Sequence, residues 1–259
     1  MVFLVVPIYL TFTNAFKENR QIVSDFFNFP NPFTTWNFER LFNDGVIQHF
    51  WNSTVITVTA VALILLILPM AAFAISREKD RGSKVFSGLY FLLLIGIFVP
   101  FQIIMIPLTG LLMSMNLANM YGLLLIYVTA ATPQAIFLYS GFIKAVIPTE
   151  LDEAATLDGC GKFRMYFQIM FPLLKPMHAT ILILNSLFIW NDFQMPLILL
   201  NRNQRHWTLP LFQYNYQTRY LGDLGPAFAA FAIGIAAIMV VYFIFQKHIV
   251  AGLSQGSIK

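Results

Sequence analysis

The chain has 259 residues, of which 58% are hydrophobic and 11% are charged, and its mean hydropathy is +0.69. An ordinary soluble domain carries roughly 25% charged residues, so the composition excludes such a domain and predicts a protein that lies in a lipid bilayer. The formal net charge of +4 comes from basic residues spread over several loops, so it does not indicate a nucleic-acid partner. The single cysteine, Cys160, excludes a disulfide within the chain.

Six apolar runs, almost free of charged residues, follow one another along the chain. They cover residues 1–16, 50–75, 85–115, 120–143, 177–200 and 226–245. A spanning helix needs about 20 apolar residues, and a charge at its centre costs about 2.5 to 3.5 kcal/mol on insertion scales. We therefore predict an all-α integral membrane protein with six transmembrane helices in a single transmembrane domain over 1–259. The first run is short, and we expect a first helix whose amino-terminal flank is missing or unusually brief.

Basic residues predict the orientation of these helices, because cytoplasmic loops carry an excess of Lys and Arg. One side of the six-helix topology holds ten of the sixteen basic residues: Arg77, Lys79, Arg81, Lys84, Lys144, Lys162, Arg164, Lys175, Lys247 and Lys259. We predict that this side faces the cytoplasm and that both termini lie on it. The outer loops are then 17–49, 116–119 and 201–225, and the aromatic-rich first loop is expected to be an ordered connector near the headgroups.

The third and fourth predicted spans contain prolines that should affect their shape. The third run contains Gly96, Pro100 and Pro107, and the fourth contains Pro133. Proline removes a helix hydrogen bond, which is tolerated in lipid only where protein or a water-lined cavity satisfies the freed backbone group. We expect kinked helices packed around a pathway. A single kink, however, is more often structural than a sign of transport.

Catalytic and cofactor motifs are missing from the sequence. None of the four histidines has metal-ligand spacing, and no Gly-x-Ser-x-Gly motif is present. The fragment from Gly159 to Lys162 imitates the end of a phosphate-binding loop. However, Thr156 stands where the first glycine is needed, and Phe163 stands where a hydroxyl must reach magnesium. We expect no catalytic residue, no metal and no cofactor in this chain.

One carboxylate falls within the apolar runs. Asp192 lies near the predicted outer end of the fifth run, and a charge at membrane depth is a functional candidate by default. With Trp190, Asn191 and Gln194 it forms a candidate pathway or gate. The alternative is a helix end made polar by nearby water, which Pro196 favours. An ion-gradient-driven carrier would need more such residues in mid-span, so it is the weaker functional class.

One long polar stretch, about 144–176, separates the fourth and fifth runs. Pro148, Thr149 and Asp152 are typical of a helix start, because proline suits the first turn and Thr-x-x-Asp can bond its free amides. Gly159 and Gly161 are expected to end this short helix. One face of the predicted helix carries small or apolar residues, namely Leu151, Ala154 and Ala155. The other face is acidic and carries Glu150, Asp152 and Glu153.

A second helix is predicted over 162–171, with Phe163, Phe167 and Met170 or Phe171 on one stripe, and with Pro172 and Pro176 at its end. Helix, turn and helix then run roughly parallel to the membrane. The alanines would let the backbone of a soluble partner approach closely. The other interpretation is a solvated loop with conventional caps.

The order of residues in this stretch resembles the signature loop of ABC importer permease subunits. The matching residues are Glu153, Ala154, Ala155, Gly159, Ile169 and Pro172, with Phe171 where the family usually has leucine. Further matches at 14–17, 52–54, 190–193, 207–210 and 246–256 look like the carbohydrate importer subgroup. They are most similar to the second permease of maltose and multiple-sugar transporters, over nearly the whole chain.

The resemblance implies the fold of a type I ABC importer permease with a cytoplasmic coupling helix. It implies a multi-pass protein of the bacterial or archaeal cytoplasmic membrane, a non-catalytic subunit surrounded by lipid. Its implied partners are a second homologous permease in a heterodimer, two cytoplasmic ATPase subunits that bind ATP and Mg, and an extracytoplasmic solute-binding protein. The implied substrate is an oligosaccharide, with glycerol 3-phosphate or another polar solute as the alternative.

The resemblance also implies roles for particular residues. ATPase coupling falls on Glu153, Ala154, Ala155, Asp158, Gly159, Gly161, Ile169 and Pro172. The tail from about 251 to 259 is expected to reach toward the ATPases as well. Contact with the binding protein is expected from the outer loop 201–225, through Trp207, Tyr214, Tyr216 and Tyr220.

Overall fold

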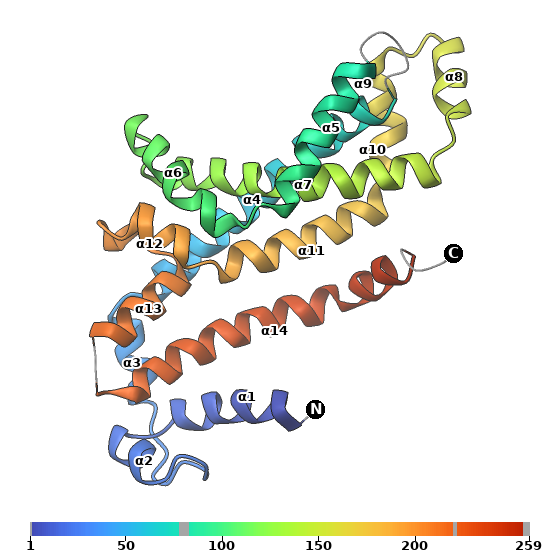
Figure 1. Cartoon of the computed structure of the whole chain (residues 1–259). Helices are drawn as coiled ribbons and strands as arrows, with labels where there is room; N and C mark the ends of the chain where they lie inside the picture. The colour runs from blue at the N-terminus through green and yellow to red at the C-terminus, as the bar shows by residue number, and fades with distance from the viewer. Residues whose placement is uncertain (1, 78–82, 220–221, 256–259) are drawn as a thin grey trace. The chain divides into compact units, whose positions relative to one another are not determined.

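The structure, a computed structural model, describes residues 2–77, 83–219 and 222–255, and every regular element in these ranges is helical (Figure 1). The prediction of an all-α fold is therefore confirmed. Lys79, Arg81, Tyr220 and Lys259, which the sequence analysis used, lie outside the described residues. The chain divides into two compact units, Met1–Val55 with Trp190–Gln246 and Ile56–Ile189 with Lys247–Lys259.

Several described helices have the length and composition of membrane spans. α4 (Val46–Arg77) and α7 (Met120–Val146) can each cross a bilayer alone. Two bent pairs qualify if each is counted as one span: α5 (Ser83–Phe98) with α6 (Phe101–Ser114), and Lys162–Leu173 with α11 (Lys175–Asn191). Shorter apolar helices occur in α1 (Val2–Ala15) and in α14 (Leu224–Gln255), whose helix continues through Gly252 of the predicted tail.

The third predicted span is broken at its proline. α5 and α6 meet at an angle of 109°, with Pro100 directly before α6, so the expected kink is a sharp bend. α7, in contrast, continues through Pro133. A Cβ atom on Gly96 would lie 3.0 Å from the ring of Pro133. Gly96 and Pro133 therefore allow α5 and α7 to approach each other closely. This packing role was not part of the predicted kinks.

The first unit is built around one apolar cluster. It draws on α1, α3 (Trp36–Asn43), the start of α4, α13 (Leu209–Arg219) and α14. Its buried members are Ala15, Leu41, Val46, Leu209, Phe212, Tyr216, Ala229, Ala230 and Ala232. The alanines on α14 allow the large rings of α13 to pack close to its backbone, which is how small residues serve helix contacts in membranes.

The loop 17–49 is ordered by buried polar contacts, in agreement with the expected connector. The Lys17 ammonium is fully buried and donates to the carbonyl oxygens of Asp25, at 2.8 Å, and Phe26, at 3.2 Å. Burial lowers the pKa of Lys17, and the Asp25 carboxylate partly opposes this shift. The buried Asn37 amide donates to the carbonyl oxygens of Ala15 and Lys17. The loop, which includes α2 (Asn19–Ser24), is thereby held against the end of α1.

A buried hydroxyl in α4 permits a stability test of this unit. Ser53 Oγ accepts a hydrogen bond of 2.8 Å from the Leu209 amide, and both residues are buried. Ser53→Ala leaves that amide unpaired, so we expect a loss of about 1–3 kcal/mol, seen as a lower Tm of the purified protein in detergent. Thr57→Val is the control, because the buried Thr57 hydroxyl has no partner and its loss should not lower Tm. An unchanged Tm for Ser53→Ala would refute the assignment.

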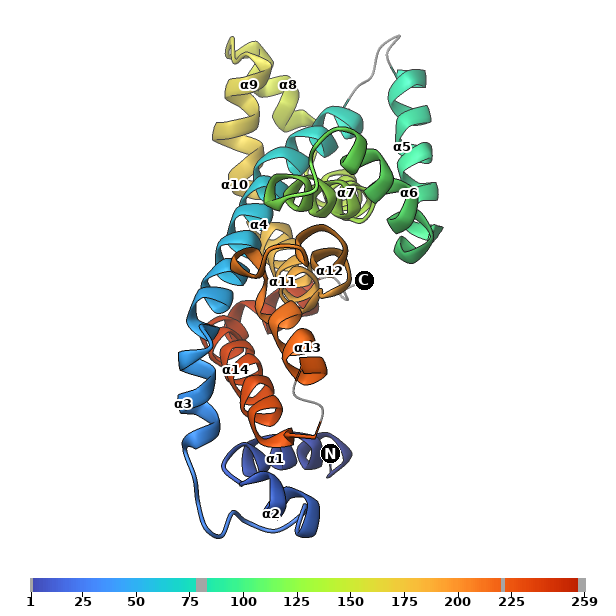
Figure 2. The same cartoon turned by 90° about the vertical axis from the view of Figure 1, so that its left-hand side faces the viewer.

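In the second unit, α4 and α7 each bury a row of side chains along their length. On α4 the buried residues Ile56, Ala60, Ile64, Leu68 and Ala72 recur every four positions, so they lie on one face of the helix. The buried face of α7 is broader and includes Leu123, Ile126, Tyr127, Ala131, Ala135, Ile136, Tyr139 and Ile143. The polar stretch projects from the end of α7 as a pair of short helices, drawn in yellow (Figures 1 and 2).

Candidate functional site

The first helix of the polar stretch, α8 (Glu150–Leu157), forms as predicted, and Gly159 directly follows its C-cap residue, Asp158. Gly159 has a φ of +73°, in the left-handed region that favours glycine. The Cys160 amide donates to the Ala155 carbonyl at 2.9 Å, and the Gly159 amide donates to the Thr156 carbonyl at 3.0 Å. These paired bonds form a Schellman motif, which satisfies the last carbonyls of the helix and reverses the chain.

The start of α8 differs from the prediction. Thr149 has helical backbone angles, and its side chain makes no capping bond. A capping side chain requires an extended backbone at that residue, so the expected Thr-x-x-Asp cap is wrong. The Asp152 carboxylate lies instead 2.8 Å from the Arg77 guanidinium.

The second helix joins α9 (Lys162–Met165), a π-helical turn η1 (Tyr166–Met170) and α10 (Phe171–Leu173). Its buried face is formed by Met165, Tyr166 and Met170. Phe163 and Phe167 are exposed, so the predicted aromatic stripe does not face the interior. The π turn shifts the register of the helix, which periodicity of 3.6 residues cannot anticipate.

Two prolines do not end this second helix as predicted. Pro172 lies within its last turn, and the helix ends one residue later at Leu173. The chain then bends by 74° into α11, and Pro176 occupies the first turn of α11. A proline is tolerated there, because the amide it lacks would have no partner in the helix. A bend at Leu174 therefore joins this helix to α11.

The structure brings all the predicted coupling residues onto one element, residues 150–173, which we call the elbow. Ala155 is buried and Ile169 is half-buried, whereas Glu153, Ala154, Asp158, Gly159, Gly161 and Pro172 are exposed. Two large apolar side chains beside the turn are also exposed, Leu157 by 88% and Phe163 by 74%. These two exposed apolar side chains make the turn a candidate interaction surface.

The start of the elbow is clamped by the last residue of α4. Arg77 Nη2 donates to the carbonyl oxygens of Ile147, at 2.6 Å, and Pro148, at 3.3 Å. Its Nε lies 2.8 Å from an Asp152 carboxylate oxygen, and both side chains are largely shielded from solvent. One guanidinium therefore contacts the end of α7 and the first turn of α8.

The end of the elbow is held by a buried tyrosine and a histidine. His178 Nε2 lies 3.1 Å from the Phe171 carbonyl oxygen, and Nδ1 lies 2.7 Å from the Tyr139 hydroxyl. Since a carbonyl only accepts, Nε2 must carry the proton that it donates, and Nδ1 of the neutral ring then accepts from Tyr139. The imidazole thus bridges α7, α11 and the last turn of the elbow.

Arg77, Tyr139 and His178 are functional candidates that the sequence does not single out. In the sequence Arg77 is one of several charges that orient the helices, and His178 has no metal-ligand spacing. A histidine inside an apolar run, two residues after a proline, could have signalled a polar link at a bend. Among the described residues there is no cluster of His, Cys, Asp and Glu that could hold a metal ion.

The candidate pathway residues lie at a break between helices. α11 ends at Asn191, α12 (Gln194–Leu200) begins after a gap of two residues, and the fifth predicted span is interrupted there. The Asp192 carboxylate accepts a bond of 2.9 Å from the amide of Gln194, the first residue of α12, where Phe193 is the N-cap residue. Trp190 packs edge-on against Phe50 at 5.5 Å. These contacts match the helix-end interpretation, and the pathway role stays a prediction.

The aromatic residues of the outer loop differ in their surroundings. Tyr216 is buried, and its hydroxyl donates to Asp44. Trp207 is half-buried, and its indole donates to the Asn201 carbonyl. Tyr214 is exposed and stacks on Phe193 at 5.4 Å. Among Trp207, Tyr214 and Tyr216, Tyr214 therefore presents the most surface to a partner.

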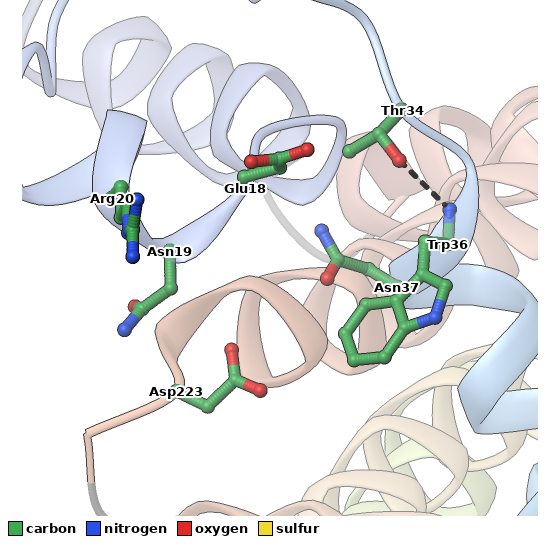
Figure 3. Close-up of a pocket in the computed structure, with 7 residues that line it drawn as sticks. All are labelled: Glu18, Asn19, Arg20, Thr34, Trp36, Asn37 and Asp223. Carbon is green, nitrogen blue, oxygen red and sulfur yellow. Dashed lines mark hydrogen bonds between the residues drawn. The ribbon is translucent and has the colours of Figure 1, made fainter.

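A hollow of about 400 Å³ lies in the first unit, beside α2 and α3 (Figure 3). It is lined by Glu18, Asn19, Arg20, Thr34, Trp36, Asn37 and Asp223. Asp223 forms an ion pair of 2.8 Å with Arg40, whose guanidinium also lies over the Trp36 ring. Thr34 accepts from the Trp36 amide, and Asn19 bonds Gly222 and the Leu224 amide. Most polar groups of the hollow are thus engaged with the protein, which indicates a structural joint.

Comparison with known protein families identifies the kind of membrane protein to which this chain belongs. Residues 69–255 match the family described as the binding-protein-dependent transport system inner membrane component. This segment contains α7, the elbow, α11 and all of α14. Such a component is a multi-pass, non-catalytic permease subunit of an ABC importer, and it works with an ATPase, a binding protein and a partner permease.

Two curated relatives align along almost the whole chain. The multiple sugar-binding transport system permease protein MsmG of Streptococcus mutans is 52% identical over 258 residues, covering 100% of this chain and 93% of the relative. The melibiose/raffinose/stachyose import permease protein MelC of Bacillus subtilis is 32% identical over 257 residues, covering 98% of this chain and 91% of the relative.

A solved structure has the same fold. It is a bacterial ABC transporter involved in the import of the acidic polysaccharide alginate, and its matching chain superposes with a TM-score of 0.79 at 22% identity. The match covers 94% of this chain and 90% of the other. The family model and the relatives lead to one conclusion: the chain belongs to the family of binding-protein-dependent transport system inner membrane components.

Proposed function

We propose that this chain is one permease subunit of an ATP-driven oligosaccharide importer and forms half of its translocation pathway. The support for a sugar substrate is the full-length similarity to MsmG, whose name assigns it to multiple sugars, and to MelC, whose name assigns it to melibiose, raffinose and stachyose. An identity of 52% along the chain carries most of this argument. A permease for glycerol 3-phosphate or another polar solute is the alternative within the family.

The elbow is the proposed contact with the ATPase, and its exposed surface is the observation that carries the proposal. Leu157 and Phe163 flank the Gly159 turn, and their exposure of 88% and 74% leaves two large side chains available to fill a partner's groove. Ala154 is exposed in the same helix and would let a partner's backbone approach. Glu153 and Asp158 add acidic charge at the rim of this surface.

The proposed assembly places the elbow in the cytoplasm with both termini. It contains a related second permease, two ATPase subunits and an extracytoplasmic binding protein. The excess of basic residues on the predicted cytoplasmic side supports this orientation. ATP and Mg would bind to the ATPase subunits. Each round of ATPase closure would push on the elbow and switch the permease pair between outward-open and inward-open states.

The outer residues have more limited roles in this proposal. Tyr214 is proposed as the contact with the binding protein, because its ring is exposed and an aromatic ring suits both protein and sugar surfaces. Asp192 is proposed to shape the pathway by holding the start of α12 beside Asn191 and Gln194. Direct contact of these residues with the solute is not required.

Reconstituted uptake tests the proposal. The chain is assembled in proteoliposomes with its partner permease and ATPase, and the uptake of radiolabelled raffinose is measured with the cognate binding protein outside. We expect uptake only with ATP inside the vesicles and binding protein outside, and we expect unlabelled oligosaccharides to compete. Uptake driven by a proton or sodium gradient without ATP would refute the proposal. Competition by glycerol 3-phosphate but not by sugars would favour the alternative substrate.

A further inference from the structure

Arg77 occupies an unusual position, because it is the last residue of α4 and contacts two other helices. The C-terminal carbonyls of a helix have no partner within it, and Arg77 satisfies two carbonyls directly after α7, those of Ile147 and Pro148. The same guanidinium lies 2.8 Å from the Asp152 carboxylate in the first turn of α8. The linker 147–149 between α7 and α8 is therefore fastened to α4 as well.

The chemistry of the clamp is specific to arginine. A guanidinium presents five donors in a rigid plane, so it can serve backbone carbonyls on one edge while it pairs with a carboxylate on another. Lysine would supply one flexible point charge and could not hold the same groups at fixed angles. The limited exposure of both side chains, 10% for Arg77 and 20% for Asp152, also reduces screening of the ion pair by solvent and salt.

We propose that Arg77 is a positioning residue for energy coupling: it fixes the base of the elbow to α4 and to the end of α7. Motion of α8 is then delivered to both of these long helices at once. Without Arg77, α8 would lose this direct link to α4, and motion of α8 would be passed to α4 less efficiently. This inference rests on the proposed function of the elbow, since it assigns how a push on the elbow reaches the spans.

The test compares coupling in the assembled transporter. Arg77→Ala, Arg77→Lys and Asp152→Asn are reconstituted with both permeases, the ATPase subunits and the loaded binding protein. For each, ATP hydrolysis and solute uptake are measured per assembled complex. We expect Arg77→Ala to lower the amount of solute moved per ATP by about tenfold, with smaller losses for Arg77→Lys and Asp152→Asn. Lys144→Ala is the matched control, because Lys144 is an exposed cation near the same end of α7, with its ammonium over the Tyr90 ring.

The readouts separate positioning from simple stability. If Arg77→Ala lowers only the yield of assembled complex, and each complex still transports the normal amount of solute per ATP, the inference is overturned. An equal loss in Arg77→Lys and Arg77→Ala would support the role of the guanidinium geometry, because lysine keeps the charge. If the wild-type assembly itself shows no ATP-dependent uptake, the proposed function fails, and this outcome is visible before any variant is compared.

Discussion

Gly159→Pro is expected to abolish uptake, because proline cannot adopt the backbone angle on which the elbow depends. The ring of proline holds φ near −65°, whereas Gly159 has a φ of +73°. Proline also lacks the amide that donates to the Thr156 carbonyl. The Schellman turn would therefore be lost, and Leu157 and Phe163 would no longer flank one turn. Uptake and the recovery of ATPase with the affinity-purified permease pair are the measurements.

A milder pair of variants separates the backbone effect from the loss of a glycine. Gly159 and Gly161 both have open space where a Cβ would be added. Their backbone angles differ, since Gly161 has a φ of −68°, which any residue adopts. Gly159→Ala places an L-residue in the left-handed region at a cost of about 1–2 kcal/mol, whereas Gly161→Ala is free of that strain.

We therefore expect uptake by Gly159→Ala to fall severalfold and uptake by Gly161→Ala to remain close to wild type. Equal activities for the two alanine variants would show that the turn at Gly159 is not needed in its observed form. Combining Glu153→Lys with Gly159→Pro should leave the subunit in the membrane and still abolish uptake or assembly. Normal uptake by that double variant would contradict the role of the elbow altogether.

The predictability of this fold varies with the kind of interaction involved. Apolar runs predicted the location of α4 and α7, because a span must be long and uncharged whatever its neighbours are. The end of α8 was predicted because the left-handed angle at Gly159 is a local property of glycine. The angle of 109° between α5 and α6 could not be predicted from the sequence, because a proline determines where a helix breaks but not the direction of the next helix.

The candidate site shows the same division. Glu153, Ala154 and Gly159 are neighbours in sequence, so their pattern predicted the exposed turn. Arg77 and Asp152 are brought together only by the packing of α4 beside the end of α7. Asp152 was assigned to a local cap because the competing partner lies 75 positions away in the chain. The Arg77 guanidinium offers the Asp152 carboxylate a full opposite charge at 2.8 Å, which a backbone amide at a helix start does not.

The hydrogen bonds of His178 lead to the second large expected effect. His178→Leu should destabilise the subunit by about 1–3 kcal/mol for each buried group that it leaves unpaired. Those groups are the Tyr139 hydroxyl and, in part, the Phe171 carbonyl, which also accepts from the Leu174 amide at 3.3 Å. Because the imidazole fixes the bend at the end of the elbow, we expect uptake to fall as well. Tm in detergent and the initial uptake rate are the measurements.

Tyr139→Phe supplies the other half of a double-mutant cycle. This variant removes the hydroxyl but keeps the ring, so it leaves Nδ1 of His178 without a donor while the bond to Phe171 persists. In the double variant no unpaired hydroxyl faces the leucine. The loss in the free energy of unfolding should therefore be smaller than the sum of the losses in the two single variants. His206→Ala, at an exposed position of the first unit, is the control and should change neither Tm nor uptake.

A strictly additive cycle would show that Tyr139 and His178 act independently, and it would remove the bridge from the account of the bend. A coupled loss in Tm with normal uptake would assign the pair to stability alone. The result that supports the bridge is a coupled loss in both Tm and uptake. Only a bridge that also sets the 74° bend connects the packing of α7 to the motion of the elbow. That bend would then be the second point, after the Arg77 clamp, at which the elbow is fixed to the spans that it moves.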